Sequence, residues 1–199
     1  MKHFFLSLFI IHCSLPIAFA QNLVPNPSFE ERTGCPDWLD EVYKADGWNG
    51  YYSPDYLHKC STNPDVSVPN NYFGYQPPYN PNDSAYCALA TYYIDDFVGG
   101  CYDEPDGREL LYTTLNNPLS IGITYYISFK VSAAFPGVWD DMRCFTDKIG
   151  VRFSMNSTAP LIDNFAHVYS NSIISDTVNW VTVSGSFVAD VAYEYIFIW

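Results

Sequence analysis

The stretch YYISFKV, at residues 125–131, alternates side chains between two faces, and this alternation decides the fold class. Strict alternation is typical of a strand with one buried face. The same period recurs at 149–153 and at 181–187, and no long segment shows the period of an amphipathic helix. The sequence therefore predicts half-buried strands of antiparallel sheets. One face of the first strand carries Tyr125, Ile127, Phe129 and Val131, and the other carries Tyr126, Ser128, Lys130 and Ser132.

Three segments around these strands look irregular. Residues 34–83 are rich in Pro, Asn, Asp, Gly and Tyr, and shorter loops are expected at 95–107 and 134–145. So long an irregular stretch is unusual in a compact domain and is often functional. Strands in the second half and elaborate loops in the first half predict an all-β, two-sheet antiparallel β-sandwich, best of the jelly-roll type.

The N-terminus has the three parts of a secretory signal peptide, at residues 1–20. Lys2 gives a basic start, and the apolar run at 4–11 is shorter than the roughly 20 residues that span a bilayer. The small residues Ala18 and Ala20 fit a cleavage site before Gln21. We expect residues 21–199 to form one exported domain with no transmembrane span; the alternative is that residues 1–20 form a membrane anchor.

Composition excludes one class of partner. The chain has a formal net charge of −13 and only nine Lys and Arg residues, so its surface repels phosphate backbones. Nucleic acid is therefore not an expected partner. The 17 Tyr, 14 Phe and 5 Trp residues are more than an ordinary core needs, which makes the aromatic side chains in the loops candidates for ligand contacts.

The cysteines predict disulfides if the chain is exported. Of the six, Cys13 lies in the signal peptide, which leaves Cys35, Cys60, Cys87, Cys101 and Cys144. Cys35 with Cys60 and Cys87 with Cys101 are the natural local pairs, but spacing alone does not fix the pairing, and an odd count leaves one thiol over. The spacing does not match a zinc site.

The last residues, 193–199, are apolar and end at Trp199 without a turn or a polar tail. We expect this to be a strand and the domain to be C-terminally incomplete, truncated before its closing strand. The alternative is a true stop with a frayed end.

Short segments spread over most of residues 21–199 occur together in one order: NLVPNPSFE (22–30), ADGW (45–48), PDY (54–56), VPNNYFGY (68–75), PL (118–119) with TYYISF (124–129), TDKIG (146–150) with FS (153–154), and DTVNW (176–180) with SGSF (184–187). With this set the chain resembles a family of exported Bacteroidetes proteins that carry an N-terminal jelly-roll domain. That domain is similar to carbohydrate-binding modules and galactose-binding-like domains. The resemblance implies a secreted or outer-membrane, cell-surface location in a Gram-negative bacterium. Relatives often continue into an OmpA-like or a type IX sorting domain.

The resemblance also implies a structural calcium ion, the one cofactor expected. Related jelly rolls use a Glu of the first strand, oxygens near it and an Asp of the closing strand. Glu30 matches that Glu, and Asn26 supplies an oxygen from the same segment. The closing-strand Asp would lie beyond Trp199, and Asp46 and Asp147 match no known ligand. The alternative is that Glu30 is an ordinary polar residue.

Carbohydrate is the expected ligand class. Aromatic rings stack on the C–H faces of sugars, while amides and carboxylates bond the hydroxyls. Asn49, Asp55, Asn70, Asn71 and Gln76 would serve the hydroxyls. The alternative is that the aromatics only pack the loops onto the sandwich, and the resemblance implies a core role for Trp48 and Trp180. The candidate sugar-contacting residues are Tyr51, Tyr52, Tyr56, Tyr72, Tyr75, Tyr79 and Trp139.

Catalysis is not expected. Asp95-Asp96 and Asp140-Asp141 are adjacent acids, whereas glycosidase carboxylates face each other across a cleft. The sequence contains no nucleophile elbow, no paired-His metal motif and no phosphate-binding glycine loop. The expected function is a non-catalytic binding module, with a glycan or polysaccharide as partner. The alternatives are a structural or adhesion module of an OmpA-like envelope protein, and an accessory domain of a secreted hydrolase.

Overall fold

The computed structural model describes residues 21–199 except 92, 96–99, 103–107, 135–144 and 159–164. Within this part the chain is built from antiparallel strands, and its helical content is limited to two short 3-10 turns, η1 (Val42–Lys44) and η2 (Pro64–Val66). The expected all-β class is confirmed. No helix in the described ranges is long and apolar enough to cross a membrane.

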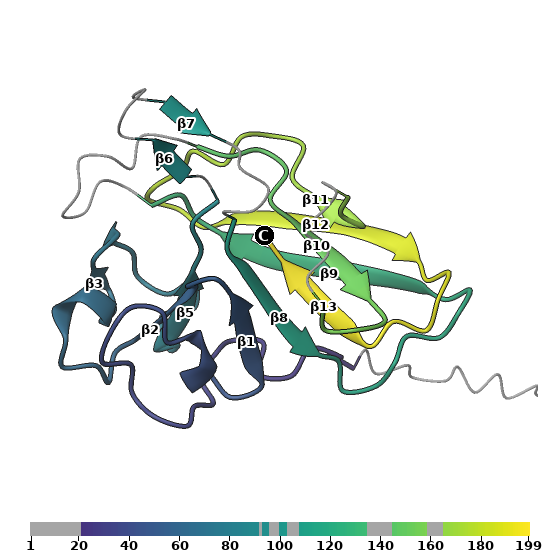
Figure 1. Ribbon diagram of the computed structural model, residues 1–199, viewed down its shortest axis with the longest axis horizontal. Coiled ribbons are helices and arrows are strands. Elements are labelled where there is room, and N and C mark those ends of the chain that lie inside the picture. Colours follow the sequence, from purple (N-terminus) through teal and green to yellow (C-terminus); the bar gives the residue numbers. More distant parts are fainter. Residues whose placement is uncertain (1–20, 92, 96–99, 103–107, 135–144, 159–164) are drawn as a thin grey trace, which may run out of the picture.

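The larger sheet has five strands in the order β1-β8-β13-β10-β11. Every neighbouring pair is antiparallel. β13 lies at the centre, between β8 and β10, so the apolar C-terminal stretch is a strand as expected (Figure 1). The strands are β1 (Trp48–Tyr51), β8 (Leu110–Thr114), β10 (Gly150–Ser154), β11 (Val168–Tyr169) and β13 (Tyr195–Ile198).

The second layer is the pair of β9 (Thr124–Val131) and β12 (Val181–Val188), which are in register over their whole length. Both strands were expected from alternation. The apolar face of β9 points into the protein. Its residues Tyr125, Ile127 and Phe129 pack against a buried cluster that includes Val151, Phe153 and Ile196 of the larger sheet. Two layers enclosing one apolar core give a sandwich-like arrangement.

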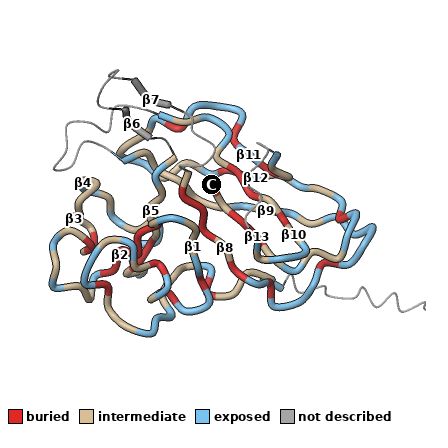
Figure 2. Tube along the Cα trace, viewed as in Figure 1, coloured by how far each residue is buried: buried red, intermediate tan, exposed pale blue. Residues whose placement is uncertain are grey.

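The segment expected to be irregular, residues 34–83, holds more structure than periodicity indicated. It contains β1 of the larger sheet, β2 (Asp55–His58), and the short pair β3 (Asn70–Asn71) and β4 (Gly74–Tyr75). β2 pairs with β5 (Ala85–Ala88). These strands are too short for alternation to show, and β2 is buried at all four positions, so its pattern could not alternate. Figure 2 shows buried residues along β8 and around β2 and β5.

A hairpin of β6 (Tyr93–Asp95) and β7 (Gly100–Tyr102) occupies part of the second expected loop. Most of the third expected loop, with the acid pair at 140–141, lies outside the described residues.

The NPSFE segment forms a turn and not a strand. Asn26 and Phe29 have φ values of 40° and 62°, and the Phe29 amide donates to the Asn26 carbonyl at 3.1 Å. The Trp48 indole N–H donates to that same carbonyl at 2.9 Å. Trp48 is only 3% exposed, which confirms its expected place in the core. The N-terminal turn is therefore fastened to the end of β1.

One of the two expected disulfides is formed. Cys35 and Cys60 are bonded, and their Cα atoms are 5.7 Å apart. The bridge joins the segment that precedes β1 to Cys60, which lies two residues after the end of β2. The expected pairing of Cys87 with Cys101 is wrong in this structure, because Cys87 is a free thiol. Its strand neighbour is Tyr56 of β2, and it packs against the apolar cluster around Trp48, so its side chain is directed into the protein.

Candidate functional site

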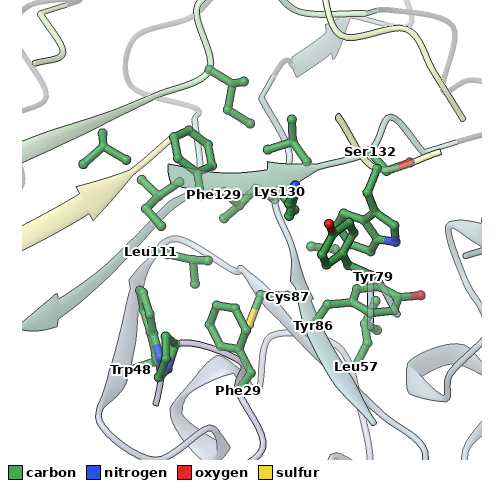
Figure 3. Close-up of a pocket in the computed structure, with 18 of the residues that line it drawn as sticks. Phe29, Trp48, Leu57, Tyr79, Tyr86, Cys87, Leu111, Phe129, Lys130 and Ser132 are labelled. Carbon is green, nitrogen blue, oxygen red and sulfur yellow. The ribbon is translucent and has the colours of Figure 1, made fainter. Parts of the chain in front are cut away.

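A large cleft opens between the layers of the sandwich, where β5 approaches β9 (Figure 3). Its volume is about 1250 Å³. Its floor is apolar: Phe29, Trp48, Leu111 and Phe129 project into it from separate elements of the fold. A cavity with mostly apolar walls and a few polar groups is the usual form of a ligand-binding site.

Two exposed tyrosines stand at the rim of this cleft. Tyr75, at the end of β4, is 64% exposed, and Tyr79, in the loop before β5, is 58% exposed. Large aromatic side chains so open to solvent contribute little to the core. The exposed surface of each ring is available to a ligand.

Lys130 of β9 lies at the same rim. Its ammonium nitrogen is 4.2 Å from the centre of the Tyr79 ring and also bonds the Thr182 hydroxyl. A cation over an aromatic face is attracted by the ring quadrupole, so this contact fixes the ring and the ammonium together. Gln76 is connected to the same place, since its side-chain oxygen accepts a hydrogen bond from the Ser132 hydroxyl at 3.3 Å.

Behind the rim, a small network holds the tyrosine-bearing loop to the sandwich. The Tyr86 hydroxyl donates to the Gln76 carbonyl at 2.8 Å and accepts from the Asn71 amide at 2.8 Å. The Trp180 indole donates to the Pro77 carbonyl at 2.8 Å and packs edge-on against Tyr86. Trp180 is half-buried, so its expected core role is met only in part. Burial raises the pKa of Tyr86, which keeps the network uncharged.

The structure separates the residues predicted to contact sugar into two groups. Tyr72, Tyr75 and Tyr79 line the cleft together, although Tyr72 is half-buried and packs edge-on against Phe73. Tyr51, Tyr52 and Tyr56 do not line it. Tyr56 is fully buried and donates to the Phe29 carbonyl at 2.8 Å, and Tyr51 packs on Tyr112 and donates to the Ser157 carbonyl at 2.7 Å.

Two predicted sugar-contacting residues remain, Tyr52 and Trp139. Tyr52 is 55% exposed but stands apart from the cleft lining, in a left-handed backbone conformation. Trp139 lies outside the described residues.

The predicted calcium ligands are already engaged in hydrogen bonds. One carboxylate oxygen of Glu30 accepts from the backbone N–H groups of Ser84 and Ala85, at 2.6 and 3.0 Å. The Asn26 side-chain oxygen accepts from the Glu31 amide, and its NH₂ group donates to the carbonyls of Glu31 and Asp46.

Within the described part of the chain, no three His, Cys, Asp or Glu side chains converge on a metal position. Calcium takes about six to eight oxygens, which carbonyl and amide groups supply as well as carboxylates. Asp46 and Asp147, the two further oxygen donors, are exposed. Calcium binding stays a prediction, which a melting curve in excess chelator tests.

The cleft also holds two buried carboxylates whose burial was not foreseen. Asp55 is 5% exposed and Glu109 is 7% exposed. Asp55 accepts from the Asp40 amide at 2.8 Å; Glu109 accepts from the Ser53 hydroxyl and the Ala90 amide, both at 2.6 Å. Burial, with the negative charges of Glu109 and Asp40, raises the pKa of Asp55 to about 7. Burial also raises the pKa of Glu109.

Sequence reasoning named Asp55 only as a polar residue near loop aromatics, and it missed Glu109. No local signal marks either residue, because burial of both depends on the distant strands that cover them. Three hydrogen bonds, from the Asp40 amide to Asp55 and from Ser53 and Ala90 to Glu109, join these carboxylates to neighbouring loops. The two carboxylates are therefore suited to stabilising the wall of the cleft.

No protein-family model, no curated protein and no solved structure matches this chain. What the cleft does must therefore be inferred from its own chemistry. That chemistry is an apolar interior, a rim of exposed tyrosines with one lysine and an amide, and carboxylates that already have hydrogen-bond donors.

Proposed function

We propose that this chain is a non-catalytic binding module of an exported protein, built on a jelly-roll sandwich, and that it binds carbohydrate at the rim of the cleft. The observation that carries the proposal is the pair of exposed rings, Tyr75 and Tyr79, beside Lys130 and Gln76. Stacking of pyranose C–H faces on such rings, with hydroxyls bonded by an ammonium and an amide, is the chemistry that sugars require.

Three further features support this proposal. The Cys35–Cys60 disulfide suits an oxidising, extracellular location. The loop that carries Tyr75 and Tyr79 is held by the Tyr86 network, so the rings are positioned before a ligand arrives, which lowers the entropy cost of binding. The buried carboxylates at Asp55 and Glu109 already accept hydrogen bonds from protein groups, which favours binding over acid–base catalysis.

The test is a glycan array followed by calorimetry on the best binder. Tyr75→Ala and Tyr79→Ala are each expected to weaken binding about 5- to 30-fold, because each removes a stacking surface worth about 1–2 kcal/mol. Tyr43→Ala is the matched control, since Tyr43 is 60% exposed and lies outside the cleft lining. Tyr52→Asn is a second control that keeps a residue tolerant of positive φ.

Equal loss of affinity in the control variants would show that the rim is not the site. No binding to any glycan on a broad array, by a folded protein with its disulfide intact, would refute the carbohydrate proposal.

A further inference from the structure

Among the described residues, β9 has a strand neighbour on one side only. Its eight residues pair with β12, and in the described part of the chain no strand pairs with its second edge. That second edge faces the cleft, because every residue from Tyr125 to Ala134 lines the cleft, whichever side its side chain takes. An unpaired edge presents a row of backbone N–H and C=O groups to whatever occupies the space beside it.

The inner face of β9 is also incompletely covered. Tyr125, Ile127 and Phe129 pack on the core yet remain half-buried, whereas Leu111 and Ile196 on the larger sheet are each only 4% exposed. Protein interiors are normally close-packed, so a half-covered inner face indicates that apolar contacts are missing on one side. The cleft of about 1250 Å³ is larger than the roughly 300–1,000 Å³ typical of small-molecule pockets.

We propose that the cleft is an acceptor site for an extended peptide strand of a partner protein, which pairs with the free edge of β9 and directs alternate apolar side chains onto the cleft floor. A strand along the whole of β9 would extend about 27 Å, at roughly 3.4 Å per residue. Addition of a strand to an exposed sheet edge is a general mode of peptide recognition, in which backbone bonds give affinity and side-chain pockets give specificity.

Backbone chemistry favours a strand over an apolar small molecule. A lipid chain would cover the floor, but it would shield the β9 edge from water without offering hydrogen-bond partners, and each unpaired buried backbone group carries a penalty. A peptide strand satisfies the edge and covers the floor at the same time.

Charge specifies the partner further. The acidic and basic residues of the described lining are Asp40, Asp55, Asp83 and Glu109, which are carboxylic acids, and Lys130, which carries an ammonium group. Asp40 is exposed and Asp83 is half-buried, so both can face an incoming chain. The complementary strand has alternating apolar residues and carries Lys or Arg at its ends. This inference does not depend on sugar binding, because the peptide would pair with the backbone edge and the inner face of β9, whereas a sugar would stack on the exposed rings of Tyr75 and Tyr79.

The probe is the synthetic peptide Lys-Val-Thr-Val-Thr-Val-Thr-Val-Lys, titrated into the full chain and followed by calorimetry and by NMR hydrogen exchange of the β9 amides. We expect saturable binding, with slower exchange at alternate β9 amides, which are those not already bonded to β12. The control peptide has the same side chains but N-methyl groups at every backbone position between its terminal lysines, which blocks both of its edges, and we expect it not to bind.

Three protein variants separate the edge from the rest of the surface. Ile127→Thr makes the inner face more polar while keeping a β-branched residue, and we expect it to weaken peptide binding about tenfold. Ser184→Thr, on the exposed face of β12 and outside the cleft lining, is expected to leave peptide binding unchanged. Tyr43→Ala, also outside the lining, is likewise expected to leave it unchanged.

Three results would overturn the proposal. The first is no binding of the peptide. The second is equal binding of the N-methylated control. The third is binding of palmitate in the cleft together with unchanged exchange of every β9 amide in the presence of the peptide.

Discussion

Replacing Asp55 by Asn should stabilise the protein at alkaline pH and have little effect in acid. Asp55 is 5% exposed, and its Oδ1 accepts one hydrogen bond, from the Asp40 amide at 2.8 Å. Burial is the main cause that raises its pKa to about 7, and the charges of Glu109 and Asp40 add to it. Asn keeps an oxygen for the Asp40 amide and removes the charge that burial penalises.

The size of the effect follows from the pKa. The ordinary value for this carboxyl is 3.8, and about 7 in the folded protein means that protonation stabilises the fold. Each pKa unit corresponds to about 1.4 kcal/mol. The folded state is therefore weakened as pH rises from about 4 to about 7, and the full penalty above that range is about 4 kcal/mol. In a chain of this size, that is a difference of about 8–16 °C in melting temperature.

The assay is chemical unfolding of wild type and Asp55→Asn at about pH 4 and about pH 8, with Asp147→Asn as the control because Asp147 is exposed. We expect the two proteins to be nearly equal at pH 4 and the variant to be more stable by several kcal/mol at pH 8. The control should show no such growth of the difference. A variant that is less stable than wild type at pH 8 would mean that the buried carboxylate is compensated by an interaction beyond those named, and would refute the reasoning.

Other parts of the molecule give predictions of the same kind. Cys35→Ser with Cys60→Ser should lower the free energy of unfolding by about 3 kcal/mol, because a loop closed over a separation of 25 residues is released; reductant should change the denaturation curve of wild type only. Trp48→Ala should lower the free energy of unfolding by about 3–5 kcal/mol and reduce secretion, while the glycan affinity of each folded molecule stays the same. Normal folding with lost glycan affinity would show that Trp48 contacts the ligand and is not a core residue. His167 accepts a hydrogen bond from the Phe153 amide at Nδ1, and burial lowers the pKa of its imidazole below 6.5. The neutral imidazole therefore contributes its full stability above pH 6.5, and this contribution is lost as pH falls through the lowered pKa of the folded state. His167→Gln should therefore lose less stability than wild type between about pH 8 and about pH 5, and identical losses would show that His167 is not responsible.

Local periodicity was sufficient for part of the fold. In residues 125–131 and 181–187 the alternation is strong because one face of each strand meets the core and the other meets water, and both strands were identified before their partners were known. β2 could not be found this way, since all four of its residues are buried and its pattern has no polar face. The same limit applies to Asp55 and Glu109, which distant segments bury.

The sequence by itself determined the all-β class and the two faces of the longer strands, because each of these depends on neighbours within a strand. It offered Cys35 with Cys60 as a natural pair, and the tertiary structure decided which pair forms. Only the tertiary structure decided which loop tyrosines share a site. In the sequence, Tyr56 and Tyr79 are equally suitable as sugar-contacting residues. In the structure, Tyr56 is fully buried and donates a hydrogen bond to the N-terminal turn, whereas Tyr79 is exposed beside Lys130. The physical reason is that exposure and proximity are set by contacts between residues far apart in the chain, which no local pattern encodes.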